Sequence, residues 1–202
     1  MAEVKVLVEG DHARLADGRL QIGSTVTLIK TDKNIIVDTG SFLDKDKIIE
    51  GLKKEGLSPE DIDLVVLSHL HLDHVVNTYL FNNANIFYKL RGGSFAGLIG
   101  FPKEGKIKRF ELVDGVELAK DVSILFTPGH TEDMISVLVN TLKGKVAITG
   151  DAIDSEKMSQ MDIQPALCWD LEEFNKSRDK ILKIADYIVP GHGDIFKVEK
   201  EL

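Results

Sequence analysis

The sequence predicts an α+β (mixed α/β) fold in which sheets are covered by helices. Short apolar segments rich in β-branched residues recur along the chain, and amphipathic helical patterns fall between runs of them. Several of these segments end in tight turns that carry histidine or aspartate. Runs of strands with helices between them are typical of layered domains with helices on the sheet faces.

Ten segments have the length and composition of strands. They are residues 4–8, 26–30, 35–37, 64–67, 85–88, 109–112, 123–126, 135–140, 146–149 and 187–189. Residues 142–144, Leu-Lys-Gly, form the turn between two of them. Residues 35–40 and 146–151 resemble one another, because each is an apolar strand that ends in a Gly/Asp turn.

The first helix is predicted to begin after Asp44 and to end at Gly56. Its apolar face carries Ile48, Ile49 and Leu52. Aspartate is a favourable N-cap because its carboxylate accepts hydrogen bonds from free backbone N–H groups, and glycine is a common helix terminator.

A second helix is predicted to begin at a capping box made by Asp170 and Glu173. Its apolar side is made of Phe174, Ile181, Leu182 and Ala185. Before it, residues 155–169 form an irregular apolar segment that is equally suited to core packing and to a pocket wall or dimer contact. Residues 90–108 form a glycine-containing loop whose apolar members could cover a pocket, although packing on the body explains them better.

Length and composition bound the class of protein. A chain of 202 residues is predicted to form a single domain, residues 1–202, with a core large enough to need no disulfide. Cys168 is the single cysteine, which excludes an intrachain disulfide and thiolate zinc sites. Because no signal peptide and no apolar run of about 20 residues is present, we expect a cytoplasmic protein without membrane association.

The net charge of −8 argues against a large nucleic-acid interface, which normally needs a basic surface. It does not exclude short RNA, since a bound metal ion can attract an anionic substrate into a small site. A small-molecule substrate is therefore the expected partner, and a homodimer stays open.

Residues 69–74, His-Leu-His-Leu-Asp-His, are the strongest functional signal in the chain. They hold three of the six histidines, and two more lie in the Gly-flanked turns at residues 127–130 and 190–193. A lone histidine at a strand end is usually a hydrogen-bonded loop residue, but that interpretation does not explain this number in this pattern. His12 lies outside the pattern and is interpreted as a surface loop histidine.

The spacing predicts two metal ions rather than one. On an extended segment, His69 and His71 point to the same face, and the turn that follows brings Asp73 and His74 together. So short a segment cannot offer all four groups to one ion. The predicted ligands of one ion are His69, His71 and His130; those of the other are Asp73, His74 and His192; and Asp151 can bridge both. Room left for solvent at each ion is typical of a catalytic site.

The motif His69-x-His71-x-Asp73-His74, followed in order by His130, Asp151 and His192, resembles the metallo-β-lactamase superfamily. The resemblance covers residues 26 to about 196, with seven ligands in separate segments. Residues 37–40 match the turn that this family places beneath the metals. Residues 57–62 and 127–131 resemble the branch that contains metallo-β-lactamase domain-containing protein 1 and small prokaryotic homologues.

The resemblance implies a four-layer αββα sandwich with two metal ions at one edge. It also implies that Asp38 orients a ligand histidine and that Asp73 and Asp151 are catalytic, with Asp73 orienting a metal-bridging hydroxide. Nitrogen and oxygen ligands suit zinc best, with iron or manganese as alternatives. The implied activity is hydrolysis of a small ester, thioester, lactone or phosphodiester.

Three other functions stay open. A persulfide dioxygenase of this superfamily would use a single iron and consume oxygen. A small endoribonuclease is suggested by the branch and disfavoured by the acidic charge. A metal-binding module without activity is disfavoured by the presence of all seven predicted ligands.

Overall fold

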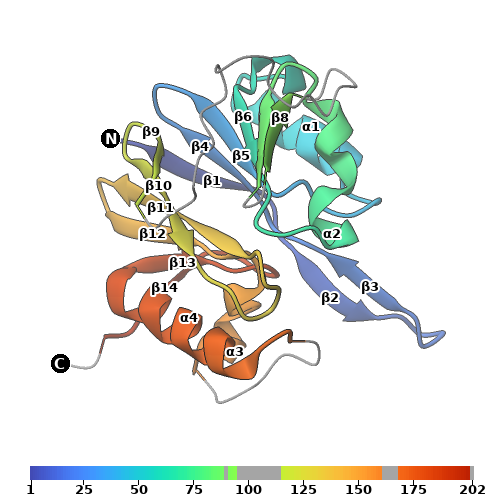
Figure 1. The fold of residues 1–202 in the computed structure, drawn as a ribbon. Helices are drawn as coiled ribbons and strands as arrows, with labels where there is room; N and C mark the ends of the chain where they lie inside the picture. The colour runs from blue at the N-terminus through green and yellow to red at the C-terminus, as the bar shows by residue number, and fades with distance from the viewer. Residues whose placement is uncertain (89–90, 95–114, 161–167, 201–202) are drawn as a thin grey trace.

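The computed structural model describes residues 1–88, 91–94, 115–160 and 168–200 (Figure 1). The predicted strand at residues 109–112 and most of the predicted pocket-covering loop lie outside the described residues, as do residues 161–167 of the apolar segment. The chain forms two six-stranded sheets that lie face to face, with helices on their outer faces.

The first sheet has the strand order β1-β4-β5-β6-β7-β8. Its parallel centre, β5–β6–β7, is flanked by antiparallel strands. The bounds are β1 Glu3–Val8, β4 Val26–Lys30, β5 Asn34–Val37, β6 Leu64–Val66, β7 Asn85–Tyr88 and β8 Arg91–Ser94.

The second sheet has the order β14-β13-β12-β11-β10-β9, in which only the pair β12–β13 is parallel. The bounds are β9 Glu117–Ala119, β10 Val122–Phe126, β11 Ile135–Thr141, β12 Gly144–Ile148, β13 Tyr187–Val189 and β14 Phe196–Lys197. Because β10 and β12 are both antiparallel to β11, strands β10, β12 and β13 run in the same direction.

The helices are short apart from two. The bounds are α1 Lys45–Lys54, α2 Leu72–Val75, α3 Glu156–Gln160 and α4 Leu171–Ile184, with 3₁₀ turns at Pro59–Asp61, Val76–Leu80 and Gly150–Ile153. Helix α1 lies on the outer face of the first sheet, and α4 on the outer face of the second (Figure 1). No helix in the described parts of the chain combines the length and the hydrophobicity needed to cross a bilayer.

Three hydrophobic clusters separate the four layers, because successive strand residues face opposite sides of a sheet. The central cluster takes Ile35 and Val37 from β5 together with Ile135 and Val137 from β11. The outer clusters take the alternate residues: Ile36 packs with Ile48 and Leu52 of α1, and Ala147 and Ile188 pack with Ile181 of α4. Both sheets are thus covered on both faces, which explains why their strands are continuous apolar runs.

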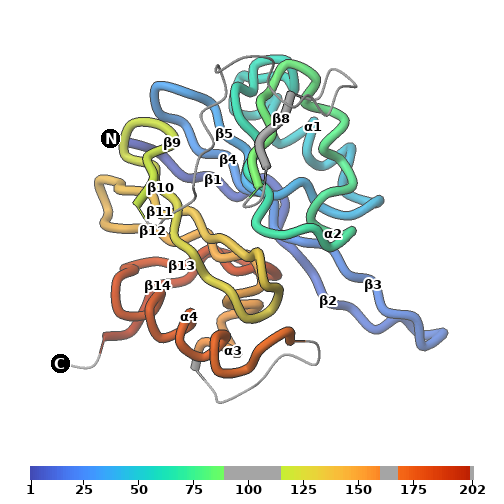
Figure 2. Tube along the Cα trace, in the orientation of Figure 1, coloured from blue at the N-terminus to red at the C-terminus, as the bar shows by residue number. Residues whose placement is uncertain are grey.

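The strands predicted within the described residues form, with end points that differ by one or two residues. A hairpin was not predicted: β2 (Asp11–Arg14) pairs with β3 (Leu20–Gly23) and extends away from both sheets (Figure 2). Strand β2 is polar, and β3 has two apolar residues, Leu20 and Ile22, which are exposed. The hairpin therefore has too short an apolar pattern to identify it as a buried strand pair.

The capping predictions have different outcomes. The carboxylate of Asp170 accepts a hydrogen bond from the Glu173 backbone N–H at 3.0 Å, which is one half of the predicted capping box. The other half does not form, because the Asp170 backbone N–H donates to the Gly129 carbonyl instead. Asp44 occupies the N-cap position of α1, but the prediction that its carboxylate caps the helix is wrong. That carboxylate instead accepts from the backbone N–H and hydroxyl of Ser41, at 2.8 and 2.6 Å, and so closes the loop before the helix.

Candidate metal centre

The candidate centre lies at one edge of both sheets, beyond the carboxyl ends of strands that run in the same direction within each sheet. Asp38 and His69 follow the parallel strands β5 and β6, while His130, Asp151 and His192 follow β10, β12 and β13. A hydrogen bond from the Ile135 backbone N–H to the Ser68 carbonyl, 3.0 Å long, joins the two sheets at this edge. Residues that are far apart in sequence therefore meet at one place.

One group of nitrogen atoms converges around His71. Its Nδ1 lies 2.9 Å from His69 Nε2 and 3.0 Å from His130 Nε2. Two ligands of a tetrahedral zinc ion, each about 2.0–2.1 Å from the metal, are separated by about 3.3 Å. The spacing of these three nitrogens is close to that value, so the group could hold a divalent cation.

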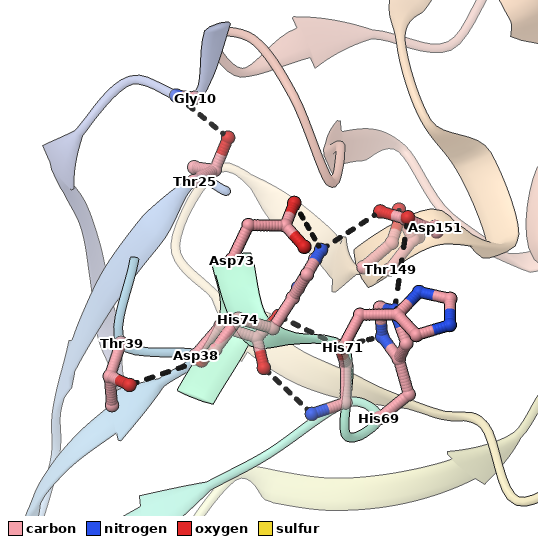
Figure 3. Close-up of polar contacts among 12 residues, drawn as sticks. Gly10, Thr25, Asp38, Thr39, His69, His71, Asp73, His74, Thr149 and Asp151 are labelled. Atoms are coloured by element: carbon pink, nitrogen blue, oxygen red, sulfur yellow. Dashed lines mark hydrogen bonds and ion pairs between the residues drawn. The ribbon is translucent and has the colours of Figure 1, made fainter. Parts of the chain in front are cut away.

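A second group is formed by Asp73, His74 and His192. Asp73 Oδ2 lies 3.7 Å from the Nε2 atoms of both histidines. Figure 3 shows the His74 ring directed between Asp73 and Asp151. Helix α2 begins at Leu72, which turns Asp73 and His74 away from the preceding extended segment and toward this second position.

Asp151 lies between the two groups, and its two oxygens face different ones. Oδ2 lies 3.3 Å from His130 Nε2 and 3.8 Å from His69 Nε2. Oδ1 lies 3.3 Å from His74 Nε2 and 3.4 Å from His192 Nε2. A carboxylate with this placement could bridge two cations.

Three of the histidines are oriented by hydrogen bonds at Nδ1. His74 Nδ1 donates to Asp38 Oδ2 at 2.8 Å, and His192 Nδ1 donates to the Gly23 carbonyl at 2.9 Å. The Ser68 hydroxyl donates to Asp38 at 2.7 Å, so it can accept from His69 Nδ1, which lies 3.0 Å away. In each neutral ring the proton then sits on Nδ1, and Nε2 offers its lone pair to the centre.

Buried polar atoms at the centre lack hydrogen bonds. His74 is fully buried, and its Nε2 makes none; neither does Oδ1 of Asp151, a residue with 7% of its surface exposed. Leaving such atoms unsatisfied costs about 1–3 kcal/mol each. A cation between them would satisfy both atoms, so the residues present fit a metal site.

Charge and burial shift the pKa values at the centre in opposite directions. Burial, assisted by the neighbouring His74, lowers the pKa of His69 to about 2, so this ring is neutral. Burial also disfavours charge on His74, but the carboxylates of Asp151 and Asp38 outweigh it and raise the pKa of His74 well above its ordinary value. His74 and His192 in turn hold the pKa of Asp151 well below its ordinary range, despite burial.

The structure brings together all seven side chains that the sequence singles out. Within each of two groups, the possible ligand atoms all lie within 4.8 Å of one another. The first group consists of His69, His71, His130 and Asp151, and the second consists of Asp73, His74 and His192. They match the two predicted ligand sets in membership, while their role as ligands stays a prediction.

His12 is exposed, as predicted, but it lies on strand β2 and not in a loop. Its ring stacks on that of His192, with centroids 3.8 Å apart, so it is not an isolated surface residue. The sequence gives no signal for this contact, because strand β2 is short and polar and nothing near His12 resembles a metal-binding motif.

Comparisons with known proteins agree with this geometry. The family model described as the metallo-beta-lactamase superfamily matches residues 20–192. Metallo-beta-lactamase domain-containing protein 1 of Xenopus laevis is 35% identical over 204 residues, covering 98% of this chain and 82% of the frog protein. The chain spans 62% of the mouse protein of the same name.

Two further similarities concern an archaeal relative and a solved structure. A protein of Methanocaldococcus jannaschii named as a metallo-hydrolase is 34% identical over 168 residues, covering 83% of this chain and 75% of that protein. The crystal structure of a Thermotoga maritima protein classed with the metallo-beta-lactamases superposes with a TM-score of 0.71 at 28% identity, covering 97% of this chain and 99% of that one.

The chain belongs to the metallo-beta-lactamase superfamily and has its fold. Within that superfamily it is a metal-dependent hydrolase, in line with its metallo-hydrolase and lactonase homologues.

Proposed function

We propose that this chain is a two-cation hydrolase that cleaves a small ester, thioester, lactone or phosphodiester. The observation that carries the proposal is the placement of Asp151, whose two oxygens face two separate groups of nitrogen and oxygen donors. Zinc is the cation we favour, because imidazole and carboxylate ligands without thiolate suit it.

Each residue of the centre has a role in the proposed reaction. His69, His71 and His130 would hold one cation, Asp73, His74 and His192 the other, and Asp151 would join them. A bound cation pair supplies a water molecule whose pKa is lowered to about 7, so that hydroxide is available at neutral pH. The carboxylate of Asp73 is partly exposed at the rim of the second group, which suits it to orient this water and to accept a proton.

The expected substrate is a small molecule. An N-acyl homoserine lactonase of Bacillus cereus is among the relatives of this chain, which favours lactones and other activated esters as the first substrates to test. The net charge of −8 disfavours a nucleic-acid substrate.

The decisive experiment combines elemental analysis of the purified protein with a panel of p-nitrophenyl esters, bis-p-nitrophenyl phosphate, γ-lactones and thioesters. We expect two cations per chain and hydrolysis of at least one class, reduced more than 100-fold by His69→Ala. Asp194→Ala is the control, because Asp194 is exposed and lies two residues beyond His192.

Other results would support the alternatives. A single iron with oxygen uptake in the presence of a persulfide would identify a dioxygenase instead. Cleavage of short single-stranded RNA that His69→Ala abolishes would identify a ribonuclease. Two bound cations with no turnover of any substrate in the panel would contradict the hydrolase assignment and point to a metal-binding module.

Asp38→Asn tests whether the tautomer of His74 governs the second cation position. Asp38 adopts φ +57°, a left-handed conformation that asparagine tolerates, so the backbone should remain unchanged. Oδ2 of Asp38 accepts from the Ser68 hydroxyl and from His74 Nδ1, while Oδ1 accepts from the Ser68 backbone N–H. An amide has one oxygen and cannot accept at both positions, so we expect cation affinity to fall about 10- to 100-fold. The measurement is competition with a chromophoric chelator, and an unchanged affinity would show that Asp38 does not act through His74.

Cation binding should release protons in amounts set by the raised histidine pKa values. The pKa of His74 and that of His192 are raised by nearby carboxylates, chiefly Asp151, against the effect of burial. A raised pKa favours the protonated ring, and a cation that binds Nε2 must displace that proton. We therefore expect affinity to rise with pH until the raised pKa values are passed.

Calorimetry at pH 7 in two buffers of different ionisation enthalpy measures this release directly. We expect net proton release on cation binding, with His74 and His192 as the source of the protons. Asp151, whose pKa is lowered, is already ionised and contributes none. Binding that releases no proton and shows no pH dependence would contradict the protonation states described above.

A further inference from the structure

His12 is the one histidine that belongs to neither donor group, yet it contacts the second. Its ring lies against the ring of His192, with centroids 3.8 Å apart and planes inclined by 26°. Its side chain is 46% exposed, and Nδ1 lies 3.8 Å from Asp154 Oδ1. The ring is therefore stacked on one face and open to solvent elsewhere.

The stacked arrangement does not suit chelation by both rings. Donor atoms of His12, Asp154 and His192 lie within 4.8 Å of one another, close enough to suggest a further cation site. An imidazole nitrogen, however, binds metal in the plane of its ring, along its lone pair. Two stacked rings place their lone pairs in two nearly parallel planes, and one nearby ion cannot lie in both planes. The contact is therefore one of packing.

Both strands of one hairpin restrain the ring of His192. The Gly23 carbonyl at the end of β3 accepts the hydrogen bond from its Nδ1, and His12 of β2 covers its face. The first contact selects the tautomer, and the second limits rotation of the ring about its Cβ–Cγ bond.

The base of the hairpin is tied to the loop that carries His192. The Thr25 backbone N–H donates to the Gly191 carbonyl at 2.7 Å, and the Thr25 hydroxyl donates to the Gly193 carbonyl at 2.9 Å. The Gly10 backbone N–H donates to the same hydroxyl at 3.2 Å (Figure 3). These bonds fix the position of the hairpin relative to the loop that carries His192. The stacking of His12 on His192 is therefore held in place by the backbone on both sides.

We propose that His12 is a positioning residue, which holds the ring of His192 in the orientation that the second cation position requires. It does so by stacking, and its nitrogens are not ligands. The inference rests on the proposed two-cation centre and concerns the second cation position alone, because the ring that His12 contacts belongs to the second donor group.

The test is titration of the cation-free protein with Zn²⁺ against a chromophoric chelator. His12→Ala should weaken one of the two binding events about tenfold and leave the other unchanged. His12→Phe should restore affinity to near that of the wild type, because a phenyl ring can stack but cannot ligate. Arg14→Ala is the matched control: Arg14 is exposed on the same face of β2, two residues further from the centre.

A double-mutant cycle shows whether the effect passes through His192. In a His192→Ala background, His12→Ala should cause no additional loss, because the ring that it orients is gone. A further loss in that background would overturn the inference. So would wild-type affinity in His12→Ala, or affinity in His12→Phe as weak as in His12→Ala.

These outcomes are distinct from failure of the proposed function. Two tight binding events in both the wild type and His12→Ala would overturn the positioning role and leave the two-cation centre intact. A wild-type chain that binds no Zn²⁺ would overturn both. Circular dichroism of each variant confirms that the chain is folded, and the exposure of His12 makes loss of folding unexpected.

Discussion

Asp151→Ala is expected to remove at least one cation from the chain while leaving it folded. The carboxylate lies within 4 Å of His69, His74, His130 and His192, so its removal takes one oxygen ligand from each proposed cation position. It also takes away the negative charge that offsets two divalent ions in a buried site. We expect the weaker of the two cations to be lost completely and hydrolysis to fall at least 1000-fold, by about 4 kcal/mol of transition-state stabilisation.

The measurement is elemental analysis after dialysis, with thermal unfolding of the cation-free chain as the test of folding. Asp194→Ala serves again as the control, since it removes an exposed carboxylate near His192 without changing the donor groups. Unchanged stoichiometry of two cations in Asp151→Ala would show that Asp151 is not a bridging ligand.

Several of the donor residues could be predicted from the sequence because short stretches of chain determine where they lie. Asp73 and His74 follow His71 directly, and a single helical start at Leu72 separates their direction from that of His69 and His71. His130 and His192 are identifiable because each sits in a Pro-Gly turn after an apolar strand. In these cases the local spacing of the residues along the chain is enough to predict where their side chains lie.

Other contacts depend on tertiary structure that no local pattern encodes. The carboxylate of Asp38 binds the Ser68 hydroxyl and the His74 ring, which are 30 and 36 residues further along the chain. Its role could be expected only from the family resemblance. The stack of His12 on His192 joins residues 180 positions apart and depends on a short hairpin whose strand β2 is polar, so the sequence did not predict it.

Gly129→Ala is expected to cause the largest loss of stability among the substitutions considered. Gly129 adopts φ +140°, which side-chain-bearing residues rarely adopt, and a Cβ there would collide with the backbone of Phe174 in the first turn of α4. Backbone atoms of a helix that buries Phe174 and packs on the second sheet through Ile181 cannot move aside as a flexible side chain can. We expect the free energy of unfolding to fall by about 3 kcal/mol, from backbone strain and overpacking together.

Gly56→Ala separates these two contributions, because Gly56 has φ +74° but no atom within 4 Å of the position a Cβ would take. It should cost about 1 kcal/mol, from backbone conformation alone. Gly129 also precedes His130, and its carbonyl accepts a hydrogen bond from the Asp170 backbone N–H at 3.0 Å. Displacing this turn should therefore move His130 and weaken cation binding in Gly129→Ala but not in Gly56→Ala.

Denaturant unfolding measures the loss of stability in each variant, and Zn²⁺ titration measures the loss of cation affinity. If the two variants lost equal amounts of stability, the close approach of Gly129 to α4 would not be the reason that this turn requires glycine.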